Sequence, residues 1–519
     1  MLLRASKVET EHVTALDLFD RVVILYVVLP VPLFLFGWLE LWAAVPLALC
    51  FFYALRPLWG PRPSEVTHFP ISRTHLAVAC VVGCVWTLLG GTGHFVFPNY
   101  DWHVRDAVLH DLVVSPWPVG YGEFDGQPSL LRAPIGYYLP AALVGKLLGL
   151  GTAHLVMALW TAMGATLFLL QVLSLTAARL RVALAVVAII VFFSGFDIIG
   201  WLISNPLRFL STWNIAQHLE WWARLYQYSS MTTQLFWAPN HALAGWLAIG
   251  LIGRDSRGSV DVMLPLIVVA AALWSPLSAL GLVPFILLKV LRGSSMERFL
   301  WLLRPQVWGP ALLIGLVIAS YLVMDSSRVP FSVNVHGRSA DELITGLMDQ
   351  LQFFLLEAGL IGFGVLALHW SWEVVLALVV LLFLPTLSFG AANDLVMRAS
   401  IPSLAVLAIA VGRALTRPAA GVTDTRKKIV LACMMCIGAV TPIQEIARAL
   451  LVPTFPINMT ATLIGASCGE QLGHYTAHFN GQLITRLLKT PRPVSSGPQG
   501  FGACFDPARQ MMWTLGLLP

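Results

Sequence analysis

Long apolar segments with few charged residues run through most of this 519-residue chain. Charged residues make up 11% of the sequence, whereas a soluble domain carries roughly 25%. A helix needs about 20 predominantly apolar residues to cross a bilayer, and fewer where it packs inside a bundle. The sequence therefore predicts an all-α integral membrane protein.

We predict about 13 transmembrane helices from the lengths of these segments. The predicted spans cover residues 20–38, 40–56, 75–93, 153–177, 183–203, 237–252, 262–275, 277–290, 308–324, 346–368, 373–388, 398–415 and 428–446. The apolar segment 134–150 is instead expected to be an interfacial or re-entrant helix. If it crossed the bilayer, the basic segments 179–181 and 254–257 would lie outside, contrary to the positive-inside rule.

Basic residues concentrate in the short loops on one side of these spans. The positive-inside rule places these loops and the N-terminus in the cytoplasm. We expect residues 1–446 to form one polytopic membrane domain and residues 447–519 to form a small non-cytoplasmic tail. The predicted outer loops are 94–152, 204–236, 325–345 and a fourth near 387–397.

Composition excludes several other classes of protein and site. The net charge of +5 is spread over the loops, and without a dense basic patch we expect no nucleic-acid partner. Five of the seven cysteines fall in apolar segments, where a small buried side chain is the simplest interpretation. Cys468 and Cys504 lie in the predicted tail, where an oxidising compartment would allow a disulfide between them.

The first outer loop places an acidic residue, Asp101, directly after a predicted span. A helical pattern follows, with His103, Asp106 and His110 on one face and apolar side chains on the other. This pattern predicts an amphipathic helix, which also carries Arg105, along the membrane surface. Asp101 could cap this helix, but a carboxylate at the membrane–water boundary also suits general-base catalysis.

Further polar candidates lie in and beside the second outer loop. Asp197 falls inside the predicted span 183–203, where an acidic residue is costly and marks a functional or bundle-interior position. His218 and Glu220 lie in the loop itself. Asn240 and His241 stand at the start of the next span, and a helix N-terminus that faces a polar cavity can help to bind a phosphate.

Two arginines in the later outer loops are candidates for binding an anion. Asp394 and Arg398 are four residues apart, so a local ion pair is one interpretation. In the other, Arg398 faces a cavity and neutralises a lipid-linked phosphate, since the guanidinium fork matches phosphate oxygens. Arg338 is the second candidate.

The layout from span 3 to about span 6 resembles the GT-C superfamily of integral-membrane glycosyltransferases. The resemblance rests on Asp101 in the first outer loop, the segment RAPIGYYLPAALVGKLLG at 132–149 and the short basic turn TAARLR at 176–181. Beyond span 6 the similarity is architectural only. The two spans before the first outer loop depart from the commonest GT-C arrangement. No WWDYG-type motif is present, which puts protein glycosylation in doubt.

The resemblance implies a glycosyltransferase that moves a sugar from a polyprenyl-phosphate donor to an acceptor hydroxyl of a glycan, lipid or protein. In this hypothesis Asp101 is the general base, and Asp197 or Glu220 is the nearest match to a second acidic residue of the family. Arg338 and Arg398 are the phosphate candidates. Some members of the superfamily use a divalent metal and others none.

The remaining candidate substrate-binding residues are His103, Arg105, Asp106, His218, Asn240, His241 and Asp394. The resemblance also implies a location in a plasma membrane such as the bacterial inner membrane, in contact with membrane lipids. The active site would then face the periplasm or the exterior.

Two other classes of function remain open at this point. A transporter or lipid flippase would place polar groups at mid-membrane and often shows two similar halves, but no repeat is visible in the sequence. A non-catalytic assembly subunit would use Asp101 only as a helix cap. The concentration of polar candidates in the outer loops favours an enzyme.

Overall fold

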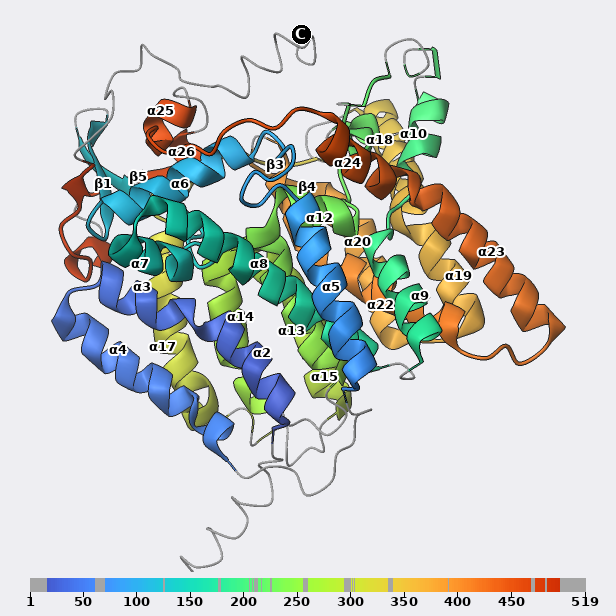
Figure 1. Cartoon of the computed structure of the whole chain (residues 1–519), viewed down its shortest axis with the longest axis horizontal. Coiled ribbons are helices and arrows are strands. Elements are labelled where there is room, and N and C mark those ends of the chain that lie inside the picture. Colours follow the sequence, from blue (N-terminus) through green and yellow to red (C-terminus); the bar gives the residue numbers. More distant parts are fainter. Residues whose placement is uncertain are drawn as a thin grey trace, which may run out of the picture.

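Figure 1 presents the fold as a broad array of helices in a computed structural model of the chain. The structure describes residues 16–494, except 61–70, 125–126, 176–178, 205, 208, 210–212, 216, 225, 255–259, 294–299, 301, 303, 335–338, 391, 468–471 and 481–482. The predicted site residue Arg338 and the cysteines Cys468 and Cys504 lie outside the described residues.

Helices dominate both halves of the described chain. The first half contains α2 (Leu18–Val28), α3 (Pro30–Trp38), α4 (Leu41–Ala54), α5 (Arg73–Leu89), α6 (Trp102–Val114), α7 (Leu139–Leu148), α8 (Leu150–Leu173), α9 (Leu180–Val191), α10 (Asp197–Ser204), α12 (Met231–Trp237) and α13 (Pro239–Arg254). The second half contains α14 (Leu264–Trp274), α15 (Pro276–Gly293), α17 (Pro305–Leu322), α18 (Ala340–Phe354), α19 (Leu360–Leu368), α20 (Trp372–Phe383), α21 (Asp394–Ala399), α22 (Ile401–Thr416), α23 (Val422–Gly438), α24 (Val440–Leu451), α25 (Leu463–Ser467) and α26 (Leu472–Tyr475).

Six helical segments in the described chain are long and apolar enough to cross a membrane. They are Leu18–Trp38, Leu150–Leu173, Pro305–Leu322, Asp341–Leu368, Asp394–Thr416 and Val422–Leu451. Several shorter apolar helices, such as α5, α9 and α20, accompany them. The prediction of a helical, membrane-embedded protein is confirmed at this level, while the larger number of about 13 spans stays a prediction.

Several predicted spans are divided into shorter helices. The span predicted at 183–203 consists of α9 and α10 with a non-helical break between them, so Asp197 begins a helix and does not lie within one. The span predicted at 346–368 contains a π-helical turn at Leu355–Gly359. Turns of this kind occur often at functional sites.

Two small sheets add strands that an all-α prediction does not contain. In the first, β5 (Thr476–His478), β2 (Gln127–Leu131), β1 (Val119–Phe124) and β6 (Arg492–Pro493) lie in this order. The second sheet joins β3 (Phe331–Val333) to β4 (Leu387–Phe389). The first outer loop and the tail therefore form one sheet, and the boundary predicted at 446 falls inside α24.

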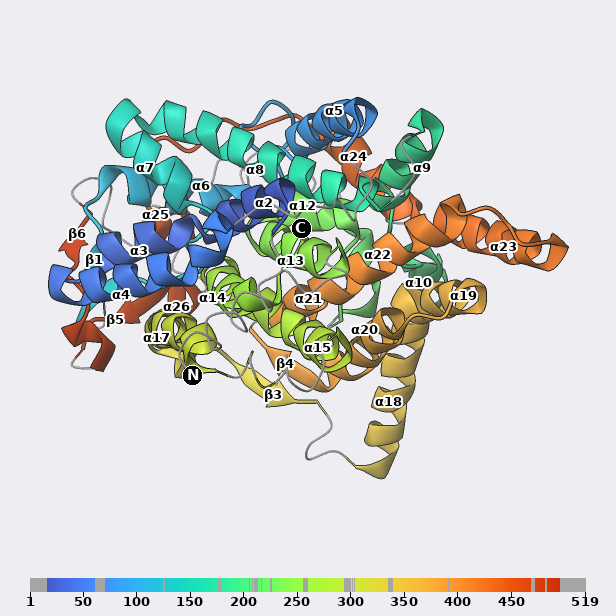
Figure 2. The same cartoon turned by 90° about the horizontal axis from the view of Figure 1, so that it is seen from below.

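The central helix of the bundle is α13, which packs against α8, α15 and α22. Figure 2 shows it between α8 on one side and α15 and α22 on the other. Nearly every residue of α13 is buried. Glycines allow the close packing, since a Cβ added to Gly245 would lie 2.5 Å from Ser278 Oγ of α15. This packing fixes the first residues of α13 at one end of the bundle.

The predicted helix after Asp101 is present as α6, but it does not lie with a solvated polar face on the membrane surface. Both of its faces are buried. The tail covers the polar face, where the Asn458 amide donates to Asp106 Oδ2 at 3.3 Å and the Leu463 amide donates to Asp111 Oδ2 at 2.9 Å. Buried carboxylates need such partners, and residues far along the chain supply them.

Candidate functional site

A cavity of about 370 Å³ lies where α6, the start of α13, the start of α15 and α21 meet. We call it the outer cavity because the topology predicted from the basic loops places this end of the bundle outside. Six of the predicted site residues line it: Asp101, Arg105, Asn240, His241, Asp394 and Arg398.

The first turn of α6 brings Asp101 and Arg105 together at the cavity. Arg105 Nη2 donates to Asp101 Oδ2 at 3.1 Å, and the Asp101 side chain is 48% exposed. Asp101 stands at the N-cap position, but its side chain makes no capping hydrogen bond. The carboxylate is therefore held beside the cavity by Arg105 and remains open to solvent.

The guanidinium of Arg105 is fixed by α13 as well as by Asp101. Its Nη1 donates to Asn240 Oδ1 at 2.6 Å, and its Nη2 also donates to the Trp237 carbonyl. Burial acts to lower the pKa of Arg105, but the neighbouring Tyr138 and Asp101 outweigh it and raise this pKa above its usual value. Arg105 is therefore a permanently charged, preorganised group.

The far wall of the cavity carries the Asp394–Arg398 pair of α21. Arg398 Nη2 lies 2.8 Å from Asp394 Oδ1, as the local-pair interpretation predicted. Both side chains also line the cavity, as the alternative required. The local pair is therefore confirmed and Arg398 also faces the cavity, while its binding of a lipid-linked phosphate stays a prediction.

Three further residues of the outer cavity were missed from the sequence: Arg132, His474 and Tyr475. The backbone amide of Arg132 donates to the Tyr475 carbonyl at 2.7 Å, which ties the end of β2 to the tail. Burial lowers the pKa of both Arg132 and His474, so the imidazole is neutral near pH 7. The only sequence feature that could have identified Arg132 is its position at the start of the Pro- and Tyr-rich segment 132–149. No local sequence pattern identifies His474 or Tyr475 as cavity residues.

The charged lining of the outer cavity is unbalanced. Arg105, Arg132 and Arg398 supply three positive charges, against two negative charges from Asp101 and Asp394. Asp325, outside this lining, also attracts Arg132. Guanidinium groups bind phosphate oxygens well, so three of them in one lining favour an anionic group such as a phosphate.

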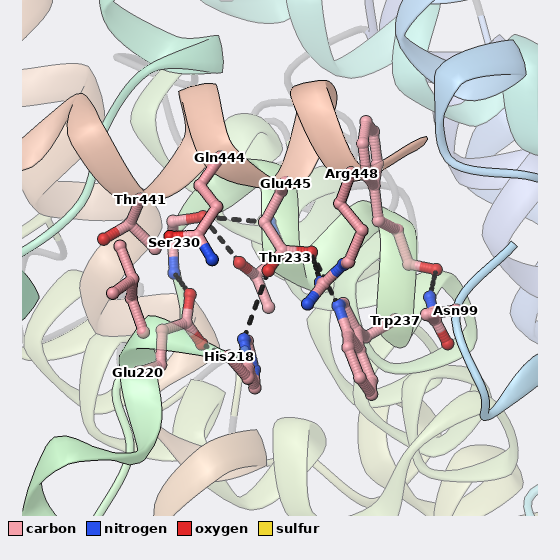
Figure 3. A network of polar contacts seen from close by, with 12 residues as sticks. Asn99, His218, Glu220, Ser230, Thr233, Trp237, Thr441, Gln444, Glu445 and Arg448 are labelled. Carbon is pink, nitrogen blue, oxygen red and sulfur yellow. Dashed lines mark hydrogen bonds and ion pairs between the residues drawn. The ribbon is translucent and has the colours of Figure 1, made fainter. Parts of the chain in front are cut away.

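A second group of predicted residues lies in a buried polar network beneath α24 (Figure 3). His218 Nδ1 lies 3.1 Å from Glu445 Oε1 and His218 Nε2 lies 3.7 Å from Glu220 Oε2. Glu445 also pairs with Arg448 and accepts from Trp237 Nε1 at 2.8 Å. Because the carbonyl of Trp237 holds Arg105, this one residue joins the network to the outer cavity.

Glu220 is a fully buried carboxylate of this network. Its Oε2 accepts from Gln227 Nε2 and its Oε1 from the Ser230 amide, both at 2.8 Å. Burial raises the pKa of Glu220 to about 7, against the opposing effect of His218. Glu220 therefore changes its charge near neutral pH.

Asp197 lies deeper, in a buried acidic pair with Glu357. Its Oδ2 accepts from Thr441 Oγ1 at 2.7 Å and from Ser194 Oγ at 3.1 Å. Glu357 is on the π-helical turn, and its Oε1 accepts from Trp222 Nε1 at 2.7 Å. Neither carboxylate lines the outer cavity.

Two candidates on α6 belong to the packing of the outer loop. Asp106 Oδ2 lies 2.8 Å from His94 Nε2, and Asp106 Oδ1 lies 3.8 Å from His154 Nδ1. His103 is also buried. Neither Asp106 nor His103 lines the outer cavity, so the structure does not bring them to a substrate there. The helical period that placed His103 and Asp106 on one face was correct, but that face points into the protein.

The part of the chain that the structure describes contains no group of three or more His, Cys, Asp or Glu side chains that could hold a metal ion. Comparisons with family models, curated proteins and solved structures find no match to this chain.

Proposed function

We propose that the chain is a membrane glycosyltransferase of the GT-C type. It would move a sugar from a polyprenyl-phosphate donor to an acceptor hydroxyl in the outer cavity. The observation that carries the proposal is the combination of Asp101, half exposed at the cavity, with three guanidinium groups in the same lining. A carboxylate base and an anion site are the two elements that this transfer requires.

Binding of the donor phosphate is assigned to the positive side of the cavity. Arg398, which pairs with Asp394, and Arg132 are the cations assigned to the phosphate, since Arg105 is engaged with Asp101. The first residues of α13 and α15 also line the cavity, and a helix N-terminus favours a nearby negative charge. The donor's isoprenoid chain would leave the cavity between the apolar helices.

Activation of the acceptor is assigned to Asp101. Its carboxylate would accept the proton of the attacking hydroxyl as the oxygen bonds to the anomeric carbon and the donor phosphate leaves. Arg105 holds Asp101 in place through the 3.1 Å contact, and Asn240 holds Arg105 in turn. Arg105 is therefore a positioning residue for the base.

The test is transfer of radiolabelled sugar from undecaprenyl-phosphate mannose, glucose and arabinose to the endogenous acceptors of membrane vesicles that contain the protein. We expect Asp101→Asn to reduce transfer by about 10²- to 10⁴-fold, the usual contribution of a general base. The matched control is Asp341→Asn, an exposed carboxylate at the start of α18. Full transfer by a folded Asp101→Asn protein would remove the assigned role.

A proton-coupled transporter is the second candidate, and one observation favours it. Asp197, Glu220, Glu357 and Glu445 are buried together with His218, and chains of buried acids and histidine serve as proton relays in transporters. Absence of transfer by the wild-type protein with every donor, combined with proton uptake on addition of a substrate, would favour this function.

A further inference from the structure

A second cavity lies at the opposite end of the bundle from the outer cavity. It has a volume of about 420 Å³ and is lined by the last turns of α8 and α13, the middle and later turns of α15 and α22, and the first turn of α20. The first residues of α13 and α15 line the outer cavity, and residues in their second halves line this one. Since α15 has 18 residues and a helix rises 1.5 Å per residue, this helix is about 27 Å long, close to the thickness of a bilayer core. The two cavities lie toward its opposite ends.

This second cavity, which we call the inner groove, has an apolar interior. Its walls are aliphatic and aromatic side chains that include Val172, Ile249, Phe285, Val406 and Ile409. An interior of this kind favours hydrocarbon over water, at roughly 25 cal/mol for each Å² of apolar surface covered.

The rim of the inner groove is basic. Lys289, Arg292 and Arg413 line it, and an adjoining cavity of about 390 Å³ shares Arg292 and Arg413 and adds Arg417. Two of these cations have acidic partners, since Lys289 Nζ lies 3.6 Å from Asp261 Oδ1 and Arg292 Nη1 lies 3.7 Å from Glu373 Oε1.

The guanidinium groups of Arg413 and Arg417 make no ion pair with any residue that the structure describes. Within the described chain, the positive charges of these two arginines are therefore not balanced by an ion pair at the mouth of the apolar groove. Trp370 and Trp372 are exposed beside them, and the Arg292 guanidinium lies 5.6 Å from the Trp372 ring. Exposed tryptophans of this kind mark the headgroup level of a membrane.

We propose that the inner groove binds an anionic phospholipid of the predicted cytoplasmic leaflet. The acyl chains enter the apolar groove between α8, α13, α15 and α22, and the phosphate lies against Arg413 and Arg417. The apolar walls, the surplus positive charge and the interfacial tryptophans are all features of an amphiphile with a negative headgroup. A soluble anion would leave the walls unused.

Lipid retention by the full-length protein in detergent, measured by native mass spectrometry, tests this proposal. The probe is phosphatidylglycerol, compared with phosphatidylcholine that has the same acyl chains. We expect preferential retention of phosphatidylglycerol by the wild-type protein. Each basic residue near an anionic lipid contributes about fivefold, so Arg413→Gln with Arg417→Gln should lower the affinity roughly 25-fold.

The matched control is Arg56→Gln with Arg426→Gln, which removes the same charge from exposed residues outside the groove. This control should retain phosphatidylglycerol as the wild-type protein does. A second variant, Ile409→Trp, leaves the charge unchanged and fills the groove, and it should reduce retention of both lipids. Size-exclusion profiles identify variants that do not fold.

Three outcomes would overturn the proposal. The first is unchanged retention of phosphatidylglycerol by the folded Arg413→Gln/Arg417→Gln protein or by Ile409→Trp. The second is protection against thermal unfolding by glycerol 1-phosphate that equals the protection by phosphatidylglycerol, which would assign the site to a soluble anion. The third is stronger retention of undecaprenyl phosphate than of phosphatidylglycerol, which would assign the groove to a carrier lipid.

Discussion

His94 Nε2 lies 2.8 Å from Asp106 Oδ2, and both side chains are almost fully buried. This contact fastens the loop after α5 to the middle of α6, while His94 Nδ1 contacts the Phe455 carbonyl of the tail at 2.9 Å. The pair thus joins the loop and α6 to a segment of the tail that lies 361 residues after His94. By fixing α6, it also fixes Asp101 and Arg105 at the end of that helix.

Stability should depend on pH through this pair. Burial acts to lower the pKa of His94, but Asp106 outweighs it and the pKa is raised. Its contribution is therefore fully present below the ordinary histidine value of about 6.5 and is lost as the pH rises through the raised value. We expect Asp106→Asn to lower stability by about 1–3 kcal/mol at pH 6 and by less at pH 9. Melting curves of wild type, Asp106→Asn and the control Asp341→Asn test this, and equal losses at both pH values would contradict it.

Glu220 should also make stability depend on pH, but through burial of its carboxyl group and not through an ion pair. Burial raises its pKa to about 7, so the folded protein retains a proton that the unfolded chain releases above its ordinary value of about 4.3. Stability from this group is highest below that value and falls as the pH rises toward 7. Glu220→Gln keeps an acceptor for Gln227 and should flatten the decline of the melting temperature between pH 5 and 8. A slope identical to that of wild type would refute the prediction.

Arg398 should contribute to binding of the donor phosphate. A charge-assisted hydrogen bond is worth about 1.5–3 kcal/mol, so Arg398→Gln should weaken binding of undecaprenyl phosphate by roughly 10- to 100-fold. Binding of undecaprenol, which lacks the phosphate, should be unaffected. Arg486→Gln, an exposed residue of the tail, serves as the control. Calorimetry or thermal-shift titration with both lipids provides the measurement, and an equal loss for the two lipids would exclude a phosphate contact.

Close packing of α15 against α21 should be sensitive to one added methyl group. A Cβ at Gly281 would overlap the backbone carbonyl of Ala399, whereas a Cβ at Gly309 of α17 would meet nothing within 4 Å. Gly281→Ala should therefore cost about 1–3 kcal/mol of stability. Gly309→Ala should be neutral or should stabilise by up to about 1 kcal/mol. Equal melting temperatures for the two variants would show that α15 can shift freely.

The local pattern of the sequence was enough to predict a helical membrane protein. Long segments with few charges fit the bilayer core, where a helix satisfies its own backbone hydrogen bonds. Helical spacing also placed His103 and Asp106 on one face of a helix and predicted the Asp394–Arg398 pair. These relationships lie within one helix. The geometry of that helix alone determines them.

Tertiary structure decided which of these groups share a cavity. Arg132, His474 and Tyr475 reach the outer cavity through pairing of β2 with β5, between segments about 350 residues apart. The helical spacing of polar residues in α6 also could not predict which segment covers the polar face of this helix. The tail buries that face, so Asp106 packs against His94 while Asp101 stays at the cavity. Long-range pairing of this kind depends on complementary surfaces that a single local pattern does not encode. It leaves Asp101, the proposed base, at the cavity and buries Asp106, which stabilises the fold.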